Sequence, residues 1–182
     1  MGGVQSRAEL DQFWQREDPW GYQAHPHDRI RVGELLAALP RRPYGHTVDL
    51  GCGDGFVTFE LPGERVTGID LSKEAIGWAE KRAATRVDRE RFHFKAASIF
   101  DVPQLGLPPA DLIVITGVLY PQYIGGAFAA IDAGLSALLA PGGILVSVHI
   151  SDWYRSSFSL SRLVMHRYPY REYEHLLEVY QR

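Results

Sequence analysis

The sequence has little cysteine, no long apolar run and little net charge, and each shortage excludes a class of protein. Cys52 is the one cysteine in 182 residues, so no internal disulfide can form, which predicts a protein of a reducing, cytoplasmic compartment. No apolar run approaches the roughly 20 residues needed to span a bilayer, so we expect no membrane partner. The formal net charge of −3 provides no general basic field, which argues against nucleic-acid binding.

Two short patterns favour simple interpretations. The first residues, MGGVQS, match the loose N-myristoylation pattern with Gly2 and Ser6 in place. The pattern is short and common, so we interpret this segment as a leader. His25 and His27 lie in a proline-containing bend, and no second pair at ligand spacing accompanies them, so we expect no metal site.

What the sequence does contain is an alternation of short apolar, β-branched runs with helical segments. Strands are predicted at HTVDLG, RVTGID, RFHFKA, ADLIVITG and ILVSVHI. Helices are predicted at 28–39, with Asp28 as cap and Pro40 as stop, and at 56–61, 73–86 and 126–139. Strands separated by helices predict an α/β fold with a doubly wound, Rossmann-like, mostly parallel sheet.

The organisation along the chain predicts a single domain, residues 1–182, in three parts. Residues 1–45 form an N-terminal arm and helix, residues 46–150 a ligand-binding core, and residues 151–182 a closing segment. In the last part HLLEVYQ reads as a strand, so we expect an antiparallel C-terminal strand, formed by a hairpin, to complete the sheet. No sequence pattern defines an oligomeric state.

Glycines after the first predicted strand and an acid at the end of the second predict a nucleoside site. Gly51 and Gly53 can adopt positive φ and let a ligand lie against the backbone. Ligands of doubly wound sheets lie at the carboxyl ends of the strands. Asp70 ends the second strand, where a carboxylate can accept both hydroxyls of a ribose.

The glycine spacing favours a ligand other than a dinucleotide. A dinucleotide fingerprint is G-x-G-x-x-G, whereas here Phe56 or Val57 stands where the third glycine is expected. Asp49 and Asp54 add negative charge beside the loop, which disfavours a pyrophosphate and is better tolerated by a zwitterion with an ammonium group. A nicotinamide-dependent oxidoreductase remains the alternative from another enzyme class.

The stretch VDLGCGDG followed by GIDLS resembles the first two motifs of class I S-adenosylmethionine-dependent methyltransferases, over residues 46–150. The resemblance implies S-adenosyl-L-methionine as cofactor, with its methionine part on the glycine loop, its ribose on Asp70, and its adenine beside Leu71 and Ile99. Ser98 takes the place where relatives often carry an acid. The cofactor residues implied in this core are Asp49, Gly51, Cys52, Gly53, Asp70, Leu71, Ser98, Ile99 and Thr116.

A narrower resemblance concerns the arm and the segment after the fourth strand. DPWGY, HPHDRIRVGELLAALP and DLIVITGVLYPQ are similar to the NodS-type nodulation N-methyltransferases. This implies an arm that folds over the cofactor, with Trp20 as its roof and Arg31 near the cofactor carboxylate. The simpler alternatives are a core aromatic for Trp20 and a surface or ion-paired residue for Arg31.

Two residues are candidates for the chemistry itself. Tyr120 follows the fourth strand, where this family places residues that face the transferable methyl, and its alternative role is packing. His149, in the fifth strand, has a ring nitrogen that could accept a proton, and its alternative role is structural.

The reaction implied is in-line displacement at the sulfonium methyl by a nitrogen or oxygen of a small-molecule acceptor. Alignment and exclusion of water do most of the work in such a transfer, so no catalytic triad is required. A hydroxyl acceptor requires a stronger base than an amine, and because no compelling base is evident we favour nitrogen. A methyltransferase-like protein that binds cofactor or a partner without turnover is the non-enzymatic alternative.

Overall fold

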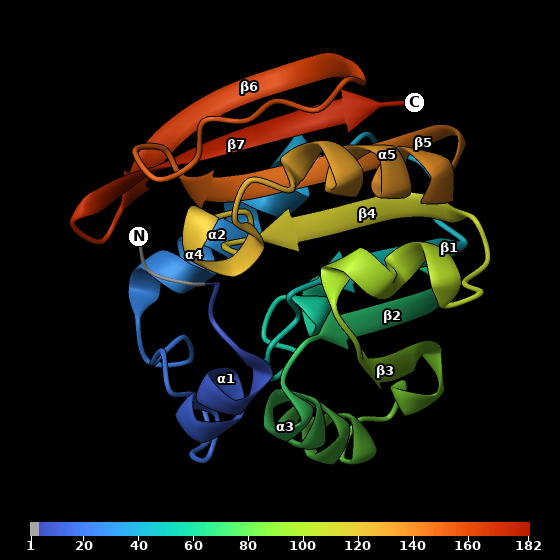
Figure 1. Cartoon of the computed structure of the whole chain (residues 1–182). Helices are drawn as coiled ribbons and strands as arrows, with labels where there is room; N and C mark the ends of the chain where they lie inside the picture. Colours follow the sequence, from blue (N-terminus) through green and yellow to red (C-terminus); the bar gives the residue numbers. More distant parts are fainter. Residues whose placement is uncertain (1–3) are drawn as a thin grey trace.

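The computed structural model describes residues 4–182, in which the chain forms a seven-stranded sheet with helices on both faces (Figure 1). The strand order is β3-β2-β1-β4-β5-β7-β6; β1 to β5 pair in parallel, and β7 pairs antiparallel with both of its neighbours. The strands are β1 (His46–Leu50), β2 (Arg65–Asp70), β3 (Phe92–Ala96), β4 (Ala110–Thr116), β5 (Leu139–Ile150), β6 (Ser161–Tyr170) and β7 (Tyr173–Gln181). The predicted doubly wound, mostly parallel sheet is confirmed.

Each face of the sheet carries its own apolar core. On one face, Ile131 and Leu135 of α5 and Val102 of η3 pack against β1, β4 and β5. On the other, Val32 and Leu35 of α2 contribute to a second core together with α3. The helices are α1 (Arg7–Phe13), α2 (Pro26–Ala38), α3 (Lys73–Ala84), α4 (Pro121–Ile124) and α5 (Phe128–Leu138), with 3₁₀ turns η1 (Thr58–Glu60), η2 (Arg89–Arg91) and η3 (Ile99–Gln104).

Two predictions on the helices are wrong in detail. The segment 56–61 forms a turn and the short η1 rather than a helix, because Leu61 precedes Pro62 and is held extended at ψ 141°. Helix α2 begins before Asp28, at Pro26, a residue that favours the first helical position. Asp28 therefore lies within the first turn, fully buried, and does not cap the helix.

The C-terminal tail contains two strands where the sequence indicated one clear strand. Strand β7 includes the predicted HLLEVYQ and fills the space between β5 and β6. Strand β6 forms the edge of the sheet, and most of its residues are exposed, so it lacks the apolar pattern of a buried strand. Its pairing with β7 shifts register between Arg162 and Val164, which marks an irregularity near the start of the strand.

The N-terminal arm contains a helix, α1, that the sequence analysis did not identify. Ser6 caps it, with a reciprocal capping box to Glu9; Gly2 of the myristoylation pattern lies outside the described residues. Trp78 Nε1 of α3 donates a hydrogen bond to the Trp14 carbonyl at 3.0 Å, which ties the arm to the body of the protein. Figure 1 shows α1 and α4 at the end of the sheet where the parallel strands terminate.

Among residues 4–182, no helix combines the length and apolar character required to cross a membrane.

We predict that the buried side chains of β7 contribute strongly to stability and that the exposed side chains of the edge strand β6 do not. Val179 is fully buried in β7, whereas its cross-strand neighbour Val164 in β6 is exposed. Val179→Ala removes two buried methyl groups and should lower the free energy of unfolding by about 2–3 kcal/mol. Val164→Ala is the matched control and should cost less than about 1 kcal/mol. Urea denaturation measures both; equal losses would contradict this account of the tail.

Candidate active site

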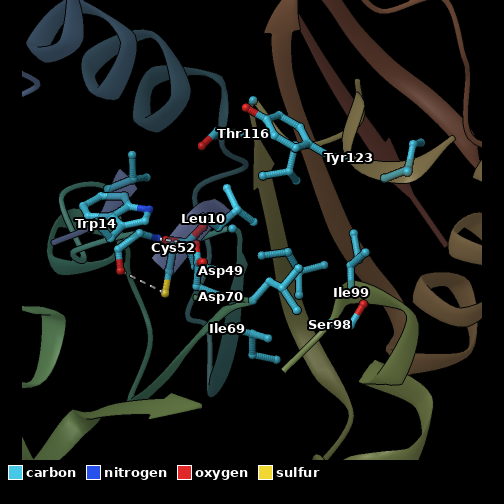
Figure 2. Close-up of a pocket in the computed structure, with 18 of the residues that line it drawn as sticks. Leu10, Trp14, Asp49, Cys52, Ile69, Asp70, Ser98, Ile99, Thr116 and Tyr123 are labelled. Carbon is cyan, nitrogen blue, oxygen red and sulfur yellow. Dashed lines mark hydrogen bonds between the residues drawn. The ribbon is translucent and has the colours of Figure 1, made fainter. Parts of the chain in front are cut away.

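A cavity of about 350 Å³ lies at the carboxyl ends of β1, β2 and β4, beneath the N-terminal arm (Figure 2). The structure brings to its wall each of the eleven predicted cofactor residues: Trp20, Arg31, Asp49, Gly51, Cys52, Gly53, Asp70, Leu71, Ser98, Ile99 and Thr116. They come from six separated segments of the chain, so the cavity is a product of the sheet topology rather than of one loop.

The glycine loop is held close to its neighbours by backbone hydrogen bonds. The amides of Gly51 and Cys52 donate to the Ile69 carbonyl of β2 at 2.8 and 3.1 Å. Gly51 adopts φ 73°, and a Cβ at this position would overlap the side chain of Val118. Gly53 adopts φ 55°, and a Cβ there would lie 2.9 Å from the Trp14 ring. Both positions therefore require glycine for conformation and for space.

Asp70 is fixed by two backbone amides at the end of β2. Its Oδ2 accepts a hydrogen bond from the Gly53 amide and its Oδ1 one from the Ser72 amide, both at 2.9 Å. Burial raises the pKa of this carboxyl, and the two amide hydrogen bonds oppose that rise. The carboxylate is thus preoriented at the cavity wall, and each oxygen keeps a lone pair for a further donor.

Asp49 is a buried carboxyl, and one of its two oxygens lacks a hydrogen-bond partner among the described residues. Its Oδ2 accepts a hydrogen bond from the Thr58 hydroxyl at 2.6 Å, and its Oδ1 has no partner among the described residues. Burial raises its pKa to about 6, against the opposing effects of Thr58 and of the nearby Arg31 guanidinium. A buried carboxylate oxygen without a donor is costly, so this position favours a ligand that brings a donor or a positive charge.

Arg31 reaches the cavity from α2. Its Nη2 lies 3.2 Å from Asp28 Oδ1, and its guanidinium packs 4.8 Å from the centroid of the Tyr22 ring. Its Nε is buried without a hydrogen-bond partner in the part of the chain that the structure describes. The wall of the cavity therefore combines one cation, Arg31, with one nearby buried acid, Asp49.

Aromatic side chains of the arm close the cavity on one side. Trp20 stacks on Tyr22 with ring centroids 6.3 Å apart, and Tyr22 packs against Phe56 at 5.7 Å. Trp14 and Leu10 of the arm also line the cavity (Figure 2). These arm residues, other than Trp20, were not predicted as site residues, because their role follows from the way the arm folds back.

Tyr120 and His149 do not occur among the described residues that line the cavity. The Tyr120 hydroxyl accepts a hydrogen bond from the Ile150 amide at 2.8 Å. His149 is fully buried; its Nε2 accepts from the Leu119 amide at 3.2 Å and its Nδ1 pairs with the Ser147 hydroxyl at 3.0 Å. Burial lowers the pKa of His149 to about 3, so the ring is neutral. Both side chains tie the segment after β4 to β5.

Tyr123, three residues beyond Tyr120, points into the cavity instead (Figure 2). Tyr120 immediately precedes the helical turn α4 and Tyr123 lies within it, so Tyr120 contacts β5 whereas Tyr123 lines the cavity. The sequence contained a signal for this residue, an aromatic pair in the segment after the fourth strand, but not the turn that distinguishes its members.

Cys52 lies between the two glycines as a buried thiol. Burial raises its pKa well above the ordinary value, and the neighbouring aspartates act in the same direction. The thiol therefore stays protonated and serves as a small packing residue. Within residues 4–182, no group of three or more potential ligand side chains could hold a metal ion.

The raised pKa of Asp49 predicts how stability depends on pH. Because the native pKa, about 6, exceeds the value of about 3.9 for an unfolded chain, protonated Asp49 favours the folded state. Its contribution is complete below about pH 4 and is lost as the pH rises through about 6. Over this range the free energy of unfolding of the unmodified protein should fall by about 2–3 kcal/mol because of Asp49. Asp49→Asn, which keeps an acceptor for Thr58, should not show this fall. Urea denaturation of both proteins at pH 4.5 and 7.5 measures it; parallel pH profiles would refute the prediction.

Known proteins resemble this chain in sequence and in fold. A family described as a methyltransferase domain matches residues 43–178. A trans-aconitate 2-methyltransferase of Paracidovorax citrulli is 34% identical over 161 residues, which cover 85% of this chain and 58% of the relative. The chain thus spans little more than half of that relative's length.

Solved structures share the fold at lower identity. The N-methyltransferase NodS of Bradyrhizobium japonicum, in complex with S-adenosyl-L-homocysteine, has a TM-score of 0.78 at 23% identity and covers 96% of this chain and 97% of its own. The [4+2]-cyclase SpnF has a TM-score of 0.76 at 10% identity and covers 100% of this chain and 98% of its own. One fold therefore hosts different reactions.

The family match over residues 43–178 is the decisive observation, because it includes the glycine loop, Asp70, β4 and the first part of β7. The chain therefore belongs to the methyltransferase domain family, and its motifs and fold are those of the class I S-adenosylmethionine-dependent methyltransferases.

Proposed function

We propose that this protein transfers the methyl group of S-adenosyl-L-methionine to a small-molecule acceptor by in-line displacement. The observation that carries the proposal is the match between the polar groups of the cavity and the parts of that cofactor. Asp70 suits a ribose, the glycine loop suits close approach of a flexible chain, and Asp49 with Arg31 suits a zwitterionic amino acid. These groups line the same cavity.

The adenosine half fits the end of the cavity formed by β2 and β3. Asp70 is held by two amides and has free lone pairs for the ribose hydroxyls. Leu71 and Ile99 supply apolar surface for the adenine. Asp101, the nearest acid after Ser98, belongs to the capping box of η3 and accepts from the Ser98 amide at 3.3 Å. Adenine recognition therefore rests on apolar contact more than on a carboxylate.

The amino-acid half fits the end formed by β1, β4 and α2. Arg31 offers a guanidinium for the carboxylate, and the unpartnered Oδ1 of Asp49 offers an acceptor for the ammonium. Each of these buried groups then gains the partner that it lacks within the protein. This satisfies both groups without an added water or metal ion.

For this reaction the protein has to align the acceptor with the methyl group and exclude water from the site. The cofactor supplies a methyl group on a positively charged sulfur, which is already a good leaving group. Val118 and Tyr123, after β4, and the arm residues Leu10 and Trp14 form apolar walls that exclude water. Alignment of the acceptor with the methyl carbon supplies the remaining rate enhancement.

The acceptor atom is one that is nucleophilic without a strong base. Asp49 and Asp70 are the carboxylates among the described lining residues, and both are assigned to the cofactor. His149 is enclosed and both of its nitrogens are bonded. A neutral amine nitrogen or a carboxylate oxygen fits this site better than an alcohol. The N-methyltransferase NodS and a methyltransferase of trans-aconitate, a carboxylate compound, are consistent with these two classes.

Binding and turnover test the proposal in sequence. Calorimetric titration of S-adenosyl-L-homocysteine should give one site per chain, and NADH fluorescence should give none, which separates this function from an oxidoreductase. A panel of small amines and carboxylates with radiolabelled methyl donor should then yield a labelled product. Binding of NADH instead of the homocysteine compound would overturn the assignment, and cofactor binding without any transfer in cell extract would favour a non-catalytic role.

We predict that Gly51→Ala disrupts cofactor binding. The new Cβ would overlap Val118, and φ 73° is unfavourable for alanine, so the loop must leave its place against the ligand. Affinity for S-adenosyl-L-homocysteine should fall at least about tenfold, equal to about 1.4 kcal/mol. Gly77→Ala is the control: it lies in α3 with open space around a Cβ, so binding should be unchanged and stability slightly raised.

A further inference from the structure

Asp28 lies at a junction of α2 and the C-terminal hairpin, two parts of the chain that are far apart in sequence. Its Oδ1 accepts a hydrogen bond from the Tyr170 hydroxyl at 2.8 Å and lies 3.2 Å from Arg31 Nη2. Its Oδ2 accepts from Arg171 Nη2 at 2.7 Å. Tyr170 and Arg171 belong to β6 and the turn that follows it, so the C-terminal hairpin contacts the ion-pair partner of Arg31, a residue that lines the candidate cofactor site. Figure 1 shows this turn at the same end of the sheet as α4.

The charges at this junction do not cancel. Two guanidinium groups, of Arg31 and Arg171, share the single carboxylate of Asp28. His175 adds no charge: it stacks on Tyr170 with ring centroids 3.7 Å apart, and burial lowers its pKa to about 3. The junction therefore carries one positive charge in excess, at a place where Asp28 is fully buried and Arg31 nearly so. A buried charge in excess is costly unless an anion joins it.

Arg171 determines which guanidinium group carries the excess positive charge. If Arg31 alone faced Asp28, the two would form a neutral buried pair with little attraction for another anion. Because Arg171 approaches the second carboxylate oxygen, at 2.7 Å against 3.2 Å for Arg31, Asp28 is already neutralised from the hairpin side. The Nε atoms of Arg31 and Arg171 both lack a partner among the described residues, but only Arg31 of the two lines the cavity, so the excess charge is available there on Arg31.

We propose that Arg171, in the C-terminal hairpin, is a positioning residue of the methyl-donor site: it neutralises Asp28 and so leaves the charge of Arg31 free for the amino-acid carboxylate of the cofactor. This rests on the proposed function of the cavity. Asp49 does not alter the balance, because its charge is matched by the ammonium group of the same ligand. Arg171 also donates to the Trp20 carbonyl at 3.2 Å, which joins the hairpin to the roof of the site.

The test compares two ligands that differ in the amino-acid portion. S-adenosyl-L-homocysteine carries the carboxylate; 5′-deoxy-5′-methylthioadenosine keeps the adenosine and the thioether but lacks it. Arg171→Gln should lower affinity for the first about tenfold, because Arg31 then pairs with Asp28, and should change affinity for the second by less than about twofold. Arg167→Gln, on the same hairpin but in an exposed pair with Glu174, is the control and should change neither.

A second variant separates charge from structure. Asp28→Asn combined with Arg171→Gln removes one charge of each sign, which restores the excess on Arg31, and should recover most of the lost affinity. The Trp20 contact is absent from both variants, so the recovery reports the charge alone. Equal losses for the two ligands, or no recovery in the double variant, would overturn the proposal. Absence of homocysteine-compound binding by the unmodified protein would instead refute the function proposed for the cavity.

Discussion

The site depends on the close approach of bare backbone to its surroundings at residues 51–53. This loop is bonded to β2 through Ile69, receives Asp70 on the Gly53 amide, and lies under Val118 and Trp14. One segment therefore contacts β2, the segment after β4 and the N-terminal arm. A side chain at Gly51 would overlap Val118 and would separate the loop from the segment after β4.

Around this loop, the groups that lack partners are the ones that face the cavity. Asp70 is bonded but keeps acceptor capacity, Asp49 has an oxygen without a donor, and Arg31 has a nitrogen without an acceptor. Buried atoms without partners also occur at Arg91, Tyr154, Arg171 and Glu178, so the feature that distinguishes Asp49 and Arg31 is that they lie beside a cavity. These polar atoms are available to hydrogen-bond a polar ligand in the cavity. The apolar residues of the arm restrict the access of water to them.

The site residues that belong to short sequence motifs could be predicted from the sequence. Gly51 and Asp70 were predictable because a loop and the end of the next parallel strand must meet at one edge of the sheet. Tyr120 was selected because it follows the fourth strand and His149 because it lies in the fifth. Contacts with β5 and with the segment after β4 direct both side chains inward, and no short pattern encodes that. The role of Asp28 depends on Arg171, 143 positions away, so it is a property of the fold rather than of a motif.

The irregular pairing of β6 bears on how the protein behaves at high concentration. Leu163, Val164 and Met165 are exposed on this edge, a composition that would otherwise template strand addition by a neighbouring molecule. The register shift after Arg162 and the missing amide proton of Pro169 interrupt the ladder near each end of the strand. The two interruptions limit the regular part of this edge to the residues between them, which shortens the stretch of β6 that a second chain could extend.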